Sequence, residues 1–171
     1  MASSVIVVET PHGQANVHFH PVEEPRAALV LGHGAGGGVT SRDLVVVTDV
    51  ARSDGVSVAL IEQPYRAAGR RSPAPARQLD AAWIAVVERL KAAELRGLRL
   101  IVGGRSLGAR VACRTAETTV AVAVLCLAFP LQPSRRATRP PSPSRLPELD
   151  RVQVPMLVVQ GARDQFGIPP A

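Results

Sequence analysis

The chain has 171 residues, of which 46% are hydrophobic and 20% are charged, and its formal net charge is +6. This length and composition predict one globular domain and exclude a disordered chain. The longest apolar run, residues 120–129, is about half as long as a membrane span, and the N-terminus lacks the basic region of a secretory signal. We therefore expect a cytoplasmic protein without a membrane anchor.

The positive charge does not have the pattern of a nucleic-acid-binding surface. Nineteen of the twenty basic residues are arginines scattered along the chain, with one Trp, one Tyr and no groove-reading or base-stacking motif. Cys113 and Cys126 lack metal-ligand spacing and are expected to be buried, reduced thiols. His18 and His20 share a strand face, but no third ligand lies nearby, so we expect exposed histidines, no metal and no cofactor.

Short β-like runs alternate with helix-like segments from the N-terminus onward. An N-terminal hairpin is expected from residues 5–8 and 15–20, and further strands at 28–31, 56–61, 98–102, 120–129 and 155–160. A capping-box-like sequence at 40–43 predicts the start of a first helix, whose apolar face would contain Leu44, Val47, Thr48 and Ala51. A second helix is predicted by the apolar stripe of Leu79, Trp83, Val86, Leu90 and Ala93. Small residues at 109, 112 and 113 indicate a third helix that packs closely on the sheet.

Two segments are expected to be loops. Residues 63–75 contain three prolines and one glycine and should expose Tyr65, Arg66, Arg70 and Arg71, either as a solvated connection or as part of a pocket rim. Residues 130–154 carry six prolines and five arginines, with a short ordered turn expected only near Leu146 and Leu149. A connection of this length suggests a lid or pocket wall, with disorder as the alternative.

Two glycine-containing motifs directly follow predicted strands. Residues 104–108 have the pattern G-x-S-x-G, which predicts a sharp strand–turn–helix with Ser106 at its strained corner. Residues 32–38 contain five glycines, whose spacing fits neither a phosphate-binding P-loop nor a dinucleotide fingerprint, so an oxyanion-binding loop is favoured. Asp164 follows the last predicted strand. In a mostly parallel, doubly wound sheet these three features meet at the carboxyl edge.

The chain resembles the α/β-hydrolases over nearly its whole length. The resemblance is carried by H-G-A-G-G-G at 33–38, G-G-R-S-L-G at 103–108, F-P-L at 129–131 and Q-G-A-R-D-Q-F-G at 160–167. This combination is similar to the dienelactone-hydrolase-like predicted hydrolases, a branch that includes a testis-expressed protein and a hydrolase-like subunit of a histone-acetyltransferase complex. The resemblance implies a single α/β-hydrolase domain spanning residues 1–171. Residues 130–154 are then the lid-like, Pro- and Arg-rich excursion of this domain that the loop length suggests.

The resemblance also implies site roles. Ser106 would be the nucleophile and Asp164 the acid that orients a histidine, while the N–H groups of Leu107 and of Ala35 or Gly36 would form the oxyanion hole. The substrate would be a small molecule with an ester, thioester or related acyl bond. His33 is expected to brace the Gly-rich loop and to take no part in proton transfer.

The sequence departs from the family pattern at the catalytic histidine. The order in this fold is Ser, Asp, His, but no histidine follows Asp164, and the four upstream, at positions 12, 18, 20 and 33, do not match the catalytic position. The expectation is a C-terminally incomplete domain without its last strand and helix, impaired in catalysis and prone to self-association through the strand at 155–160. The alternative is a non-catalytic, hydrolase-like interaction module.

Overall fold

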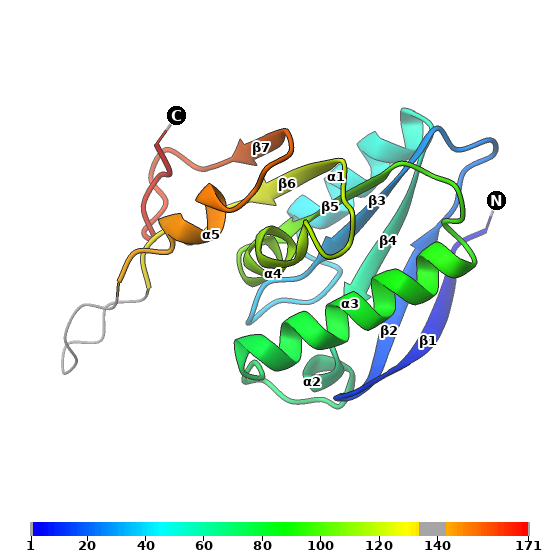
Figure 1. Cartoon of the computed structure of the whole chain (residues 1–171), viewed down its shortest axis with the longest axis horizontal. Coiled ribbons are helices and arrows are strands. Elements are labelled where there is room, and N and C mark those ends of the chain that lie inside the picture. The colour runs from blue at the N-terminus through cyan, green and yellow to red at the C-terminus, as the bar shows by residue number, and fades with distance from the viewer. Residues whose placement is uncertain (1, 134–142, 171) are drawn as a thin grey trace.

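The computed structural model describes residues 2–133 and 143–170. Its strands form a single sheet in the order β1-β2-β4-β3-β5-β6-β7 (Figure 1). β1 and β2 form an antiparallel hairpin, β2 pairs antiparallel with β4, and the remaining pairs are parallel. The expected mostly parallel sheet with an N-terminal hairpin is therefore confirmed. The strand bounds are Ser4–Thr10, Gly13–His20, Ala27–Gly32, Val56–Glu62, Leu100–Arg105, Ala123–Leu127 and Met156–Val159, for β1 to β7 in turn.

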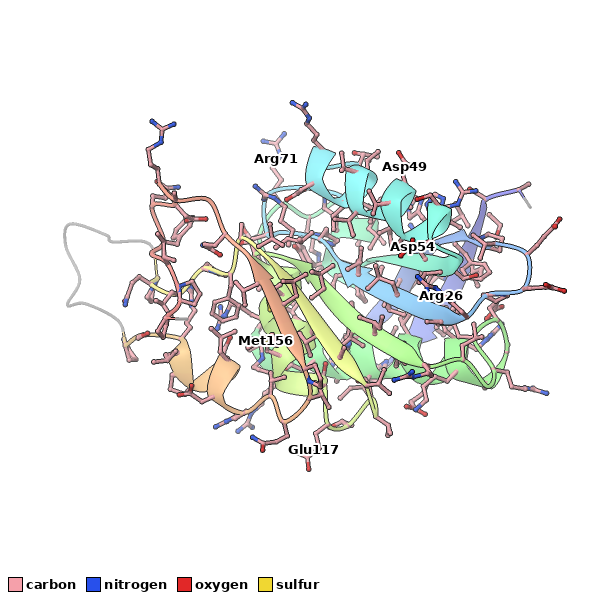
Figure 2. The ribbon with its side chains drawn as sticks, turned by 90° about the horizontal axis from the view of Figure 1, so that it is seen from above. Arg26, Asp49, Asp54, Arg71, Glu117 and Met156 are labelled. Atoms are coloured by element: carbon pink, nitrogen blue, oxygen red, sulfur yellow. The ribbon has the colours of Figure 1, made fainter. Side chains whose placement is uncertain are left out.

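Helices cover the sheet on both faces. α1 lies alone on one face, and α3 and α4 lie on the other (Figures 1 and 2). Alternate residues of β3 point to opposite faces: Val30 packs in the cluster with Trp83 of α3, and Leu31 packs in the cluster with Leu44 of α1. The helix bounds are Arg42–Ser53, Pro64–Ala67, Ala76–Ala92, Leu107–Thr115 and Leu146–Asp150, for α1 to α5 in turn.

The two ends of the parallel part of the sheet differ in burial. β4 is buried over six of its seven residues, as a strand covered on both faces should be, whereas β7 is largely exposed. Leu157 and Val159 of β7 pair in register with Leu125 and Leu127 of β6, which pack on the α1 side of the sheet. Their side chains therefore face the α1 side, 62% and 53% exposed, at the sheet end where Met156 is labelled in Figure 2.

Charged and sulfur-containing side chains connect α4 to its neighbours. Arg110 makes a bidentate contact with Glu148 of α5 at 2.7 and 2.8 Å, and Arg114 bridges Glu148 to Asp80 of α3. The buried, free thiols of Cys113 and Cys126 lie 3.5 Å apart between α4 and β6. The contact with Cys126 and burial raise the pKa of the Cys113 thiol, so it stays protonated.

Several local predictions were wrong. α1 begins after Ser41, which makes no side-chain capping bond, so the expected capping box does not form. The connection after β4 contains the short helix α2, and its Tyr65 is 5% exposed instead of lying on the surface. β6 starts only at Ala123, because Val120 adopts φ of 56° in the preceding turn and leaves the extended conformation.

The remaining local predictions agree with the structure in part. The expected inward residues of α3 are buried except Ala93, which follows the end of the helix and is exposed. The lid expected at 130–154 falls partly on residues 134–142, which lie outside the described residues. From 143 onward this segment contains α5, whose Leu149 reaches the core.

Candidate active site

Ser106 occupies a sharp turn between β5 and α4. Its φ of 52° and ψ of −106° are unusual for a residue with a side chain, and α4 begins at the next residue. The backbone N–H of Ser106 donates to the carbonyl oxygen of Leu127 at 2.9 Å, which holds the turn to the end of β6. The strand–turn–helix geometry expected from G-x-S-x-G is therefore present.

Glycines allow the turn to pack directly against the start of the Gly-rich loop. A Cβ on Gly108 would overlap the carbonyl group of Gly32, and a Cβ on Gly104 would lie 2.9 Å from the nitrogen of Gly32. A Cβ on Gly34 would lie 3.7 Å from Cβ of Ser106. Backbone-to-backbone contact therefore fixes the position of the Gly-rich loop relative to Ser106.

The predicted oxyanion-hole donors come from these two neighbouring segments. Leu107 is the first residue of α4, where a backbone N–H has no partner within the helix and the positive end of the helix dipole lies. Within residues 2–133 and 143–170, the N–H groups of Ala35 and Gly36 donate to no protein acceptor. These groups remain available to an oxyanion, and their role stays a prediction.

His33 holds the Gly-rich loop from inside the protein. Its side chain is 2% exposed; Nδ1 donates to the carbonyl oxygen of Gly34 at 2.8 Å, and Nε2 accepts from the backbone N–H of Gln63 at 3.2 Å. This pattern requires the neutral imidazole, and burial lowers the pKa of His33 in agreement with it. With both ring nitrogens engaged, His33 has the bracing position expected from the sequence.

Asp164 lies in the turn after β7. Its Oδ1 accepts from the backbone N–H of Phe166 at 2.8 Å, and its backbone N–H donates to Gly161. Ser106 and Asp164 line the same open cleft of about 430 Å³. The other lining residues are Arg105, Ala128, Arg163, Gln165 and Phe166.

None of the four histidines lines this cleft. His33 is engaged by Gly34 and Gln63, and the other three belong to the β1–β2 hairpin. His18 and His20 are partly exposed on β2, and Nδ1 of His20 lies 2.8 Å from Oγ of Ser3. Across the described residues, no three His, Cys, Asp or Glu side chains are grouped to hold a metal ion. No described helix is both long and apolar enough to cross a membrane.

Three supporting contacts were missed in the sequence. The hydroxyl of Tyr65 donates to the carbonyl oxygen of Ala35 at 3.2 Å, and the backbone of Gln63 contacts His33. Arg105 forms an ion pair with Asp43 of α1 at 2.6 Å, beside the cleft. Gln63 directly follows a buried strand, and this position at the carboxyl edge was the signal that could have identified it.

Comparison with known proteins identifies the family to which this fold belongs. The family of the alpha/beta hydrolase domain matches residues 25–170, most of the chain. The chain belongs to this family. No curated protein sequence matches this α/β hydrolase significantly.

Several solved structures share the α/β-hydrolase fold of the chain. XC6422 from Xanthomonas campestris, described as a serine hydrolase without lid, has a TM-score of 0.73 at 18% identity, over 94% of this chain and 71% of that one. A serine hydrolase homologue from Coxiella burnetii has a TM-score of 0.75 at 13% identity, over 94% and 74%. Est1E from Butyrivibrio proteoclasticus has a TM-score of 0.61 at 18% identity, over 73% of this chain and 51% of its own.

Proposed function

We propose that this α/β hydrolase is of the serine-hydrolase type and acts on an ester, thioester or related acyl bond through Ser106. The observation that carries the proposal is that Ser106 and Asp164, 58 positions apart, line one cleft at the carboxyl edge of the sheet. The two neighbours described as serine hydrolases support the same reaction class. The motifs at 33–38 and 160–167 favour a dienelactone-hydrolase-like member.

The chemistry requires a base, an oxyanion hole and a leaving group. As Oγ of Ser106 bonds to the acyl carbon, the base takes the hydroxyl proton and the carbonyl oxygen becomes negative. The N–H groups of Leu107 and of Ala35 or Gly36 would stabilise this charge by about 3 kcal/mol per donor. Collapse of the intermediate breaks the bond to the alkoxide or thiolate, which takes the proton from the base, and water then hydrolyses the acyl-serine.

None of the four histidines of this sequence supplies the catalytic base. His33 has both ring nitrogens engaged, and none of the four lines the cleft. We therefore propose low intrinsic activity for these 171 residues, limited to oxyanion-hole and binding contributions. Asp164 stands beside the cleft as the carboxylate that would orient an imidazole ring.

Imidazole from solution provides a direct test. Turnover of p-nitrophenyl acetate should rise saturably with imidazole, above the rate that imidazole gives alone, and Ser106→Ala should abolish the rise. In the presence of imidazole, Ser106 should also react with a fluorophosphonate probe, because the added base supplies the activation that the chain lacks. Ser134, Ser142 and Ser144 remain in the Ser106→Ala variant and control for labelling of other serines.

The competing function is a non-catalytic interaction module. The exposed apolar side chains of β7 favour this alternative, since Leu157 and Val159 are 62% and 53% exposed. If neither labelling nor imidazole-dependent turnover depends on Ser106, catalysis by this chain is excluded and the interaction module becomes the better account. Capture of partners by the wild type and by a Leu157→Lys variant would then be the next measurement.

A further inference from the structure

A second pocket lies between α4 and α5, the neighbouring helices beside β6 and β7 in Figure 1. It is open, has a volume of about 460 Å³ and shares no lining residue with the cleft of Ser106 and Asp164. We call it the α5 pocket. Its lining consists of four arginines, one glutamate, one serine and three prolines. The volume lies within the range of small-molecule sites.

Two of the four arginines are held in place by carboxylates. Arg110 contacts both oxygens of Glu148, and Arg114 contacts Glu148 and both oxygens of Asp80. The side chains of Arg110 and Arg114 are only 21% and 12% exposed. Burial opposes ionisation of Glu148, but the two arginines lower its pKa, so it stays charged. One side of the pocket is therefore a fixed charge network.

The other two arginines add positive charge that no carboxylate balances. Arg145 and Arg151 form no ion pair with any described residue. Nη1 of Arg145 donates to the carbonyl oxygen of Pro130 at 2.9 Å, which positions this side chain at the pocket. Burial and the charge of Arg110, opposed by Glu148, lower the pKa of Arg145. Arg145 therefore lies in surroundings that are already positive.

The chain around the pocket supplies no further counter-charge. Asp150 of α5 is exposed and does not line the pocket. Residues 134–142, which join Pro133 to Pro143 along the chain, contain three arginines and no Asp or Glu. The four lining arginines thus have only two carboxylate partners, Glu148 and Asp80. An excess of two positive charges in one pocket favours an anionic ligand.

Several guanidinium nitrogens remain able to donate to such an anion. Nη1 of Arg110 and both Nε and Nη2 of Arg145 donate to no described residue, and none of them is a buried atom without a partner. Arg151 is exposed. The planar guanidinium group matches the oxygens of phosphate, and a phosphomonoester carries about −1.5 to −2 charges at pH 7. Its charge fits the excess, and the three prolines offer apolar surface to its organic part.

We propose that the α5 pocket binds the phosphate group of a small phosphomonoester, with Arg110, Arg145 and Arg151 donating to its oxygens. Arg114 has all three nitrogens engaged and acts as a positioning residue for Glu148. The site does not depend on the proposed function, because it shares no residue with the cleft and its tests measure binding alone.

Phenyl phosphate and phenyl sulfate form a matched pair of probes, since they have similar shapes and the phosphate carries the larger negative charge at neutral pH. In ¹H–¹⁵N NMR titrations, phenyl phosphate should shift the amides of Arg145, Glu148 and Arg151 saturably. Phenyl sulfate should bind about fivefold more weakly, the upper value of one exposed ion pair. Equal affinities would overturn the match to a dianion, and the lack of a saturable shift at these amides would overturn the site.

Variants at Ser144 test the role of charge in the lining. Ser144 is exposed, and its Oγ accepts the backbone N–H of Leu146 at 3.2 Å, an acceptor that Asp or Asn can replace. Ser144→Asp adds a carboxylate to the pocket and should weaken phenyl phosphate binding about tenfold or more. Ser144→Asn is the neutral control and should stay within about twofold of the wild type. Equal affinities in the two variants would refute the proposal.

A variant of Arg151 tests one proposed donor. Arg151→Gln should weaken phenyl phosphate binding about tenfold, the value of one charge-assisted hydrogen bond. Arg71→Gln makes the same change of charge at an exposed residue outside the pocket, labelled in Figure 2, and should leave binding unchanged. An equal loss in both variants would reveal only a general attraction of anions to a positive protein and would overturn the site. Binding of the polyanion heparin without binding of phenyl phosphate would also overturn it.

Discussion

The two halves of the candidate site are built in different ways. Ser106 and the Gly-rich loop are held by backbone packing at Gly32 and Gly108 and by the buried His33. Asp164 follows the exposed strand β7, and its turn is held by its own hydrogen bonds and by bonds to the segment after β6, where the backbone N–H of Gln132 donates to the carbonyl oxygen of Phe166 at 2.7 Å. The nucleophile half therefore depends on close backbone packing in the core of the domain, whereas the acid half depends on hydrogen bonds beside an exposed strand. Substitutions should separate the two.

The largest effect on the free energy of unfolding is expected from one methyl group added at Gly108. Gly108→Ala would push Cβ into the carbonyl group of Gly32, so we expect a loss of about 3 kcal/mol or more in the free energy of unfolding. Gly161→Ala, which follows β7 and whose Cβ would meet nothing within 4 Å, should change it by less than about 0.5 kcal/mol. Urea unfolding of the two variants tests the contrast. Equal stabilities would contradict it.

The buried histidine should make the nucleophile half sensitive to acid. Burial lowers the pKa of His33 below its ordinary 6.5, assisted by Arg66 and opposed by the Gly34 carbonyl and Glu62. Its contribution to stability is therefore complete above about pH 6.5 and is lost as pH falls toward the folded-state pKa, because only the unfolded chain takes up the proton. The expected slope approaches about 1.4 kcal/mol per pH unit for this one proton.

His33→Asn should remove the loss of stability that His33 causes as the pH falls. The free energy of unfolding, measured with urea between pH 7 and pH 5, checks this. The matched control is His20→Gln: partial burial and the neighbouring Arg52 and His18 lower the pKa of His20, but the side chain is partly exposed, so its slope should be smaller. An unchanged pH profile in His33→Asn would show that the imidazole is not held neutral.

A smaller effect is expected in the acid half. Asp164→Ala removes the acceptor for the N–H of Phe166 and should cost about 1 kcal/mol. Asp164→Asn keeps an oxygen acceptor and should cost less than about 0.5 kcal/mol, yet it should reduce imidazole-dependent turnover about tenfold or more, since an amide cannot stabilise an imidazolium. Full turnover in Asp164→Asn would leave Asp164 with a purely structural role.

The smallest effect on stability is expected at the exposed face of β7. Leu157→Lys should change the free energy of unfolding by less than about 0.5 kcal/mol, because the side chain is 62% exposed. It should nevertheless reduce self-association in sedimentation velocity, since a lysine on an edge strand opposes pairing. Val5→Lys, on the opposite edge strand at 59% exposure, is the control. A monomeric wild type would contradict the expected association.

The difference between local signals and contacts of distant segments also determines which features could be predicted from the sequence. The strands, their parallel arrangement and the turn at Ser106 follow from apolar periodicity and glycine spacing, which are local signals. The burial of Tyr65 could not be predicted, because its hydroxyl is paired with Ala35, 30 positions earlier. The ion pair of Arg105 with Asp43 also requires knowing which face of the sheet α1 covers. Contacts between distant segments leave no periodic pattern in the chain.

The Gly-rich loop also divides into a fixed part and a part that protein engineering can vary. Gly32 and Gly34 face close neighbours, but a Cβ on Gly36, Gly37 or Gly38 would meet nothing within 4 Å, and none of these three has a positive φ. A Cβ can therefore be introduced at positions 36–38 without displacing the backbone that meets Ser106. A combinatorial library restricted to these three positions would vary the segment that contains the predicted donor N–H of Gly36 while leaving the contacts of Gly32 and Gly34 intact.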